Sequence, residues 1–219
     1  MSASYCFLCV PAVQSSKIIS RLTDFLSQRG MKITNLRTQS EAATPLRFKT
    51  NKVLFVSPPT GPWVQIAGWP SELEIDFRSW YLSNPLALQL SLEILPVLFF
   101  WTFGGGRAVG YSIFEGGSLV ESQSVGTIGG IDEPPFSSSG GSRIAAVLND
   151  QAFHFREFTQ GLTKDYELAV AMLAKRLGCK WHLLDIMDLV DGEGGIAIEE
   201  GKRLPLRLDG WTAIEYATL

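Results

Sequence analysis

Short apolar runs with the spacing of β-strands occur along most of the chain. Val97–Phe103 is apolar at every position except Thr102, so we expect a central strand that is buried on both faces. In the next segment, Arg107–Phe114, large apolar residues fall on alternate positions, which is the period of a strand. Further strands are expected at 5–10, 31–36, 53–57, 63–69, 118–124, 181–184, 195–198, 204–208 and 211–217.

Helical periodicity is confined to fewer segments. Apolar residues repeat at helical spacing from Ile18 to Leu26, and we expect Ser15 or Ser16 to cap this helix and Gly30 to end it.

Later segments carry further helix signals. A helix is expected after Asn84, with Pro85 at its first position. Thr163–Leu177 has a helical pattern that Gly178 ends, and 144–158 is expected to be helical in part.

These elements indicate an α+β fold. We expect a mainly antiparallel sheet with a β-meander around residues 97–124 and two or three helices packed on one face of it. The whole chain, 1–219, is expected to form a single domain. The alternative is two sub-domains, 1–125 and 143–219, joined by the loop 126–142, which is rich in Gly, Ser and Pro.

Two segments hint at an internal repeat. "WVQIAGW" (63–69) and "WTAIEYA" (211–217) both place an isoleucine three residues after a tryptophan. They are interpreted either as part of two pseudo-repeated halves or as two edge strands with similar burial.

The glycine clusters in "WTFGGGRAVGYSIFEGG" (101–117) raise the question of a phosphate-binding loop. A dinucleotide fingerprint needs a third glycine where Val109 stands, and a P-loop needs Lys and Ser/Thr where Arg107 and Ala108 follow Gly106. A strand pattern follows instead of a helix, so no helix N-terminus would face a phosphate. We therefore expect turns of a β-meander, with no anion at the first cluster.

Charge and cysteine content narrow the class of protein. The net charge is −3, which argues against a nucleic-acid binder. The longest apolar-looking run, 86–103, contains polar residues and a proline, so we expect no membrane span there.

The three cysteines make no disulfide framework, so a reducing compartment is expected. No basic residue precedes Lys17, unlike the start of a signal peptide. We expect a bacterial, cytoplasmic protein.

The charges are unevenly spread along the chain. Residues 1–52 hold eight basic and two acidic residues, whereas residues 111–219 hold nine basic and sixteen acidic ones. Such a dipole can steer an acidic partner to the N-terminal end. The alternative is that the two ends lie near each other and neutralise.

The "CFLC" segment matches a redox motif only in its spacing. Cys6 and Cys9 fall in an apolar strand, three residues apart and hence on opposite faces, whereas a redox pair needs a helix N-terminus. A second pair of cysteines for a zinc site is missing. Both cysteines are interpreted as small buried hydrophobic residues.

Candidate chemistry elsewhere is sparse. His182, with Asp185 nearby in sequence, and the thiol of Cys179 are the catalytic candidates. Serine-hydrolase and zinc-protease motifs are missing from the sequence.

An acidic segment near the C-terminal end partly matches a calcium-binding loop. "LVDGEGGIAIEE" places Asp191, Glu193 and Glu200 at ligand-like spacing, but Leu189 stands where the first ligand should be. An acidic turn is the preferred interpretation, and we expect no metal and no cofactor.

The middle of the chain resembles a family of uncharacterised bacterial α/β proteins. The resemblance is carried by "WVQIAGW", "LALQLSLEI", "VLFFWTF", "GYSIFEGGSLVESQS" and, later, "AKRLGCK". It covers about residues 63–180 and includes the hairpin motif Y-x-x-[FY]-x-x-G. The family pattern often has aspartates between the apolar strand and the hairpin, where this chain has "GGGRA". The resemblance implies a fold style and no known activity.

Two functions of different classes follow from the sequence. The first is a non-catalytic binding or protein-interaction module, immunity-like or regulatory, suggested by the missing catalytic motifs and the many aromatic residues. The alternative is a hydrolase or small-ligand enzyme that uses carboxylates with His182. The expected partner is another protein.

Overall fold

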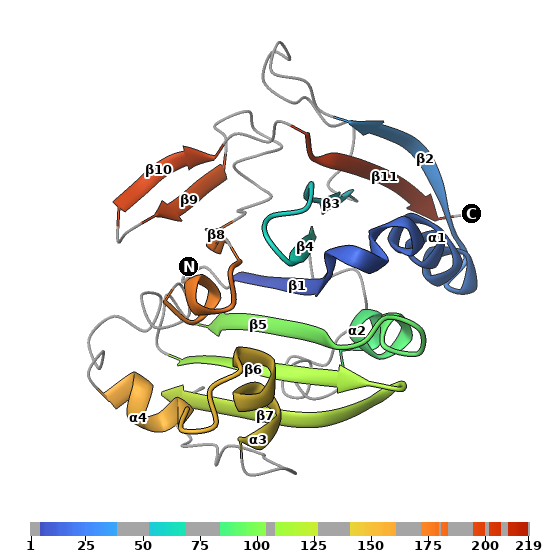
Figure 1. The fold of residues 1–219 in the computed structure, drawn as a ribbon. Coiled ribbons are helices and arrows are strands. Elements are labelled where there is room, and N and C mark those ends of the chain that lie inside the picture. Colours follow the sequence, from blue (N-terminus) through green and yellow to red (C-terminus); the bar gives the residue numbers. More distant parts are fainter. Residues whose placement is uncertain are drawn as a thin grey trace.

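The computed structural model describes residues 5–38, 53–68, 84–103, 108–126, 141–160, 172–179, 181–183, 195–199, 202–206 and 210–218. Within these residues, the strands form one large and one small sheet (Figure 1). The large sheet contains β1 (Tyr5–Pro11), β2 (Met31–Thr38), β3 (Val53–Val56), β4 (Trp63–Gly68), β5 (Val97–Phe103), β6 (Ala108–Glu115), β7 (Ser118–Gly126) and β11 (Thr212–Thr218). The small sheet contains β8 (Trp181–Leu183), β9 (Gly195–Glu199) and β10 (Lys202–Leu206).

The helices are short. They are η1 (Ala12–Lys17, a 3-10 helix), α1 (Ile18–Gln28), α2 (Pro85–Leu90), α3 (Ser142–Leu148) and α4 (Phe155–Gln160). Residues 172–176 are also helical, in agreement with the end of the helix expected before Gly178. Because the sheet is antiparallel and dominates over a few, mostly short helices, the α+β prediction is confirmed.

The large sheet is antiparallel throughout, in the order β2-β11-β3-β4-β1-β5-β6-β7. The expected central strand, β5, lies between β1 and β6. The C-terminal strand β11 lies between β2 and β3, next to the N-terminal part of the chain (Figure 1). Arg37 of β2 pairs there with Glu215 of β11 at 3.2 Å, so one described contact neutralises opposite charges from the two ends.

The interpretation of "WVQIAGW" and "WTAIEYA" as two edge strands is wrong. β4 has β3 and β1 as neighbours, and β11 has β2 and β3 as neighbours, so both strands are internal. Their similar apolar patterns reflect burial on both faces of the sheet, since residues 63–67 and 213–216 are all buried.

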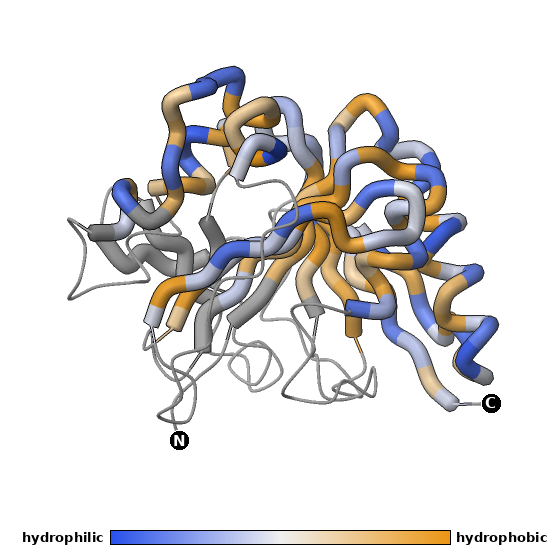
Figure 2. The backbone as a smooth tube through the Cα atoms, turned by 90° about the horizontal axis from the view of Figure 1, so that it is seen from below, coloured by the Kyte–Doolittle hydropathy of each residue, from blue (hydrophilic) through white to orange (hydrophobic). Residues whose placement is uncertain are grey.

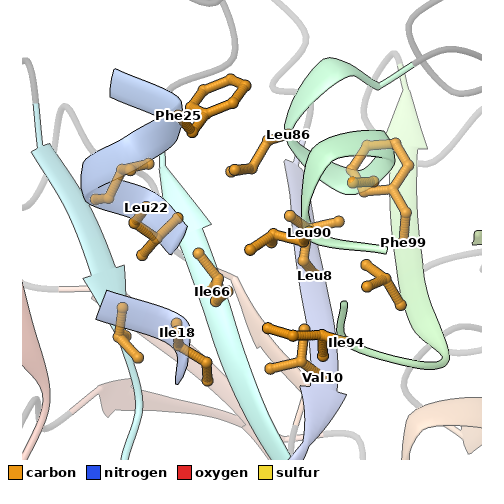
Figure 3. Close-up of a cluster of buried hydrophobic side chains, with 14 of the residues drawn as sticks. Leu8, Val10, Ile18, Leu22, Phe25, Ile66, Leu86, Leu90, Ile94 and Phe99 are labelled. Carbon is orange, nitrogen blue, oxygen red and sulfur yellow. The ribbon is translucent and has the colours of Figure 1, made fainter. Parts of the chain in front are cut away.

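Helices cover both faces of the large sheet, which corrects the expectation of one covered face. Successive residues of a strand point to opposite faces, and along β5 they enter two different cores in turn. The first core holds residues of α1 and α2, and Figure 3 shows Leu22 and Leu90 of these helices facing Leu8 and Ile66 of the sheet. The second core holds residues of α3, α4 and the helix at 172–176. In Figure 2 the central strands are accordingly the most hydrophobic stretches of backbone.

The β-meander prediction is confirmed. β5 and β6 pair antiparallel from Val97–Phe114 to Phe103–Ala108, and β6 pairs antiparallel with β7. Gly116 and Gly117 form the second turn with φ of 57° and 75°, which are values that favour glycine. The first glycine cluster, 104–106, lies outside the described residues.

The helix-start signals had mixed outcomes. Asn84 caps α2 as predicted, since its side-chain Oδ1 accepts a hydrogen bond from the Ala87 N–H at 2.9 Å. Neither Ser15 nor Ser16 caps α1, because both lie within η1, which runs directly into α1. The turn of η1 supplies the backbone acceptors that a capping side chain would otherwise provide.

Candidate functional site

The residues predicted to carry chemistry are only partly described. His182 lies in β8, where its register partner is Ala197 of β9. Cys179 lies three residues after the helix at 172–176, the last helix in the described part of the chain, and is buried. Asp185, Asp191, Glu193 and Glu200 lie outside the described residues, so the enzyme and calcium hypotheses stay predictions. In the described part of the chain, no three His, Cys, Asp or Glu side chains are grouped as a metal site requires.

The structure brings Cys179 to a residue that the sequence did not connect with it. Its Sγ lies 3.6 Å from the Sγ of Cys9, although the two residues are 170 positions apart. Cys9 is completely buried in the second core, as expected of a small hydrophobic residue, and both thiols are free. The pair joins the central strand β1 to the end of the last helix.

Cys9 is fixed by its neighbours in the sheet. Its register partners are Gln65 of β4 and Leu98 of β5, and both are buried. Burial raises the pKa of the Cys9 thiol well above its usual value, the contact with Cys179 raises it further, and the Gln65 side chain partly opposes the shift. The burial and the contact with Cys179 outweigh the effect of Gln65, so Cys9 stays protonated at neutral pH.

The backbone around Cys179 is fixed by a helix-ending motif. The Cys179 N–H donates to the Ala174 carbonyl at 2.8 Å, and the Gly178 N–H donates to the Lys175 carbonyl at 3.0 Å. Gly178 has a φ of 76°, so these bonds form a Schellman motif with Cys179 as its last residue.

Strand β4 anchors the same helix end. The indole N–H of Trp63 donates to the Leu177 carbonyl at 2.8 Å, in a buried position. The turn before β4 is also close, because a Cβ placed on Gly61 would lie 2.8 Å from the Gly178 carbonyl oxygen. The contact between Cys9 and Cys179 is therefore held from both sides by well-packed elements.

A second buried polar cluster centres on Glu121 of β7. Its Oε1 accepts a hydrogen bond from the Tyr111 hydroxyl at 2.6 Å and from the Ile144 N–H at 3.1 Å, while Oε2 accepts from the Arg143 N–H at 2.9 Å. Gly141 at the N-cap of α3 has no side chain that could cap the helix. The Glu121 carboxylate of β7 instead accepts the hydrogen bonds of the first N–H groups of α3. The cluster attaches α3 to the sheet.

This role of Glu121 was not predicted from the sequence. The available signals were an acidic residue within an expected strand and a helix that follows glycines instead of a capping residue. Neither signal names the partner, because Glu121 and Arg143 of α3 are 22 positions apart and meet only in the folded chain.

Tyr111 is expected to make the protein less stable in alkali. Burial raises the pKa of its phenol far above the usual value of 10, and the hydrogen bond to the Glu121 carboxylate adds to the shift. Because the unfolded tyrosine ionises near pH 10 while the folded one stays protonated, its stabilisation is complete below that pH. It is lost as pH rises, at about 1.4 kcal/mol per pH unit.

This pH dependence is measured by urea unfolding between about pH 9 and pH 11. Tyr111→Phe has no phenol that ionises on unfolding. We therefore expect its free energy of unfolding to fall less steeply with rising pH than that of the unsubstituted protein. Identical slopes for the two proteins would contradict the assignment.

Three apolar side chains on the side of the sheet that α1 and α2 cover are exposed. Val13 of η1 is 91% exposed, and Leu92 and Leu95, in the connection between α2 and β5, are 56% and 47% exposed. We call these three residues the η1 surface. The Gln14 side-chain amide donates to the Leu95 carbonyl at 3.2 Å, so the two segments lie side by side.

Comparisons with known proteins add no functional information. No helix among the described residues is long and apolar enough to cross a membrane. The resemblance to uncharacterised bacterial α/β proteins stays a prediction. A comparison of the chain with protein-family models, with curated proteins and with solved structures found no match to any of them.

Proposed function

We propose that the chain is a cytoplasmic, non-catalytic module that binds another protein through the η1 surface. The observation that carries the proposal is the 91% exposure of Val13, a large aliphatic side chain at the start of a helix. Single exposed apolar residues are common, but here three of them lie on two segments that are bonded to each other.

The η1 surface is held in place before any partner binds. Besides the bond between Gln14 and Leu95, Arg21 of α1 forms an ion pair with Glu93, which lies between Leu92 and Leu95 in sequence. Arg21 also pairs with Asp24 at 3.2 Å. Segments whose backbone is already ordered lose less conformational entropy on binding, which favours affinity.

Exposed basic side chains on η1, α1 and the start of β2 favour an acidic partner, and Glu93, the carboxylate between Leu92 and Leu95, is paired with Arg21. Lys17 at the end of η1 is exposed, as are Arg29 and Lys32 at the far end of α1 and the start of β2. Arg29 lies over the ring of Phe25 at 4.4 Å, which leaves its charge at the surface. We therefore propose a partner that presents apolar side chains within an acidic rim.

Val13→Glu is expected to weaken binding to that partner at least tenfold, which is about 1.4 kcal/mol. The substitution removes an apolar contact and adds a charge that an acidic partner repels. Affinity capture with the tagged protein identifies the partner, and titration calorimetry with the purified pair measures the affinity. Because Val13 is almost fully exposed, the fold is expected to be unaffected.

Met172→Glu is the matched control. Met172 is 40% exposed and lies on a helix that covers the other face of the sheet, so this change adds the same charge away from the η1 surface. We expect it to bind as the unsubstituted protein does. Equal affinity of both variants for the partner would contradict the proposal.

A further inference from the structure

The pair of buried thiols has no part in the proposed binding function. Cys9 and Cys179 are 170 positions apart, and the 3.6 Å between their sulfur atoms is close to van der Waals contact. A disulfide has an S–S length of about 2.05 Å. The sulfur atoms thus need to approach by about 1.5 Å for the bond to form.

We propose that Cys9 and Cys179 are a modification site at which hydrogen peroxide forms a disulfide between β1 and the end of the last helix. The proposal rests on the sulfur–sulfur contact and on the elements that hold it: the register of β1 between β4 and β5, and the helix end bonded to Trp63. It is independent of the η1 surface.

The two thiols differ in access, which orders the reaction. Cys179 keeps 5% of its surface exposed, whereas Cys9 has none. Peroxide therefore reaches Cys179 first. The Cys179 sulfur attacks one peroxide oxygen, the O–O bond breaks, and the product is a sulfenic acid with release of one water.

Cys9 then completes the bond. Its sulfur attacks the sulfenic sulfur of Cys179, the S–O bond breaks, and the hydroxyl leaves as a second water with the proton of Cys9. In total, two thiols lose two electrons and two protons, and one peroxide is reduced to two waters. Because burial raises the pKa of Cys9, this step is slow at neutral pH and speeds up as pH rises.

The disulfide would close a loop that spans most of the chain. A cross-link over about 170 residues restricts the unfolded state strongly, so we expect the melting temperature to rise by about 10 °C on oxidation. A reducing agent should reverse the rise. The third cysteine, Cys6, lies outside the proposed bond.

The test uses the Cys6→Ala variant, which keeps only the two proposed thiols. It is treated with hydrogen peroxide under native conditions, quenched in acid, and alkylated after unfolding. We expect no alkylated cysteine, a monomer with two fewer hydrogens, and a linked peptide pair that contains Cys9 and Cys179. If the variant fails to fold, peptide mapping of the unsubstituted protein gives the same information.

The single-cysteine variants test the order of the reaction. With Cys6 and Cys9 both replaced by alanine, Cys179 should accumulate as a sulfenic acid that dimedone labels, and the melting temperature should not rise. With Cys6 and Cys179 replaced, Cys9 should stay unlabelled. Two alkylatable thiols in oxidised Cys6→Ala, or bonds only between molecules, would overturn the proposal.

Discussion

Replacing Glu121 by alanine is expected to lower the free energy of unfolding by about 3–5 kcal/mol. This side chain is completely buried and accepts hydrogen bonds from the Tyr111 hydroxyl and from the N–H groups of Arg143 and Ile144. Its removal leaves the buried Tyr111 hydroxyl and Ile144 N–H and the partly buried Arg143 N–H without their acceptor, beside a small cavity.

The loss should be concentrated at α3. This helix has seven residues and is too short to be stable alone, and Gly141 at its N-cap gives it no side-chain bond. Tyr111 would also lose the bond that fixes its ring against Phe155, whose centroid is 5.0 Å away in an edge-to-face arrangement. We therefore expect faster amide exchange in α3 than in α1 of the variant.

Glu115→Ala provides a matched control for this prediction. Glu115 also contacts Arg143, through a 2.7 Å bond to the guanidinium Nε, but this bond is exposed to solvent. Its loss should lower the free energy of unfolding by less than about 1 kcal/mol. Urea unfolding compares the two variants, and similar small losses in both would show that the buried carboxylate is not what attaches α3 to the sheet.

Local patterns predicted the elements of this fold well, because each depends on neighbours in sequence. The apolar run of β5, the glycine turn at Gly116 and the Asn84 cap are of this kind. The strand order is different, since the position of β11 between β2 and β3 depends on contacts between the two ends of the chain. Nothing in the spacing of residues within β11 states which strands it joins.

At the candidate sites, too, features that depend on neighbours in sequence were predictable, and contacts between distant residues were not. Cys9 was expected to be buried, and it is, but its contact with Cys179 spans 170 positions and has no sequence signal. Helices were expected on one face, because strand alternation does not say what covers each side. Two apolar faces on β5 were visible in the sequence, and two cores are their consequence.

Gly110 is a glycine of the β-meander that forms no turn. It lies inside β6, where Trp101 of β5 is its register partner. A Cβ on Gly110 would lie 2.4 Å from Cζ2 of Trp101 and 2.5 Å from the Gln123 carbonyl oxygen. Glycine is required here because the completely buried indole ring occupies the place of a side chain.

Gly110→Ala is therefore expected to lower the free energy of unfolding by about 3 kcal/mol or more, because neither the packed ring nor the neighbouring backbone can move freely. Gly116→Ala is the control: its φ is positive but nothing lies within 4 Å of the added atom, so a loss of about 1 kcal/mol is expected. Both are measured by urea unfolding.

A double-mutant cycle identifies the ring as the cause. Trp101→Phe removes the indole atoms closest to the added methyl group, so the two substitutions together should destabilise the protein by less than the sum of their separate effects. We expect a coupling of at least about 1 kcal/mol, with the remaining loss due to the Gln123 carbonyl. Strict additivity would mean that Trp101 does not determine the need for glycine, and that the backbone of β7 alone does.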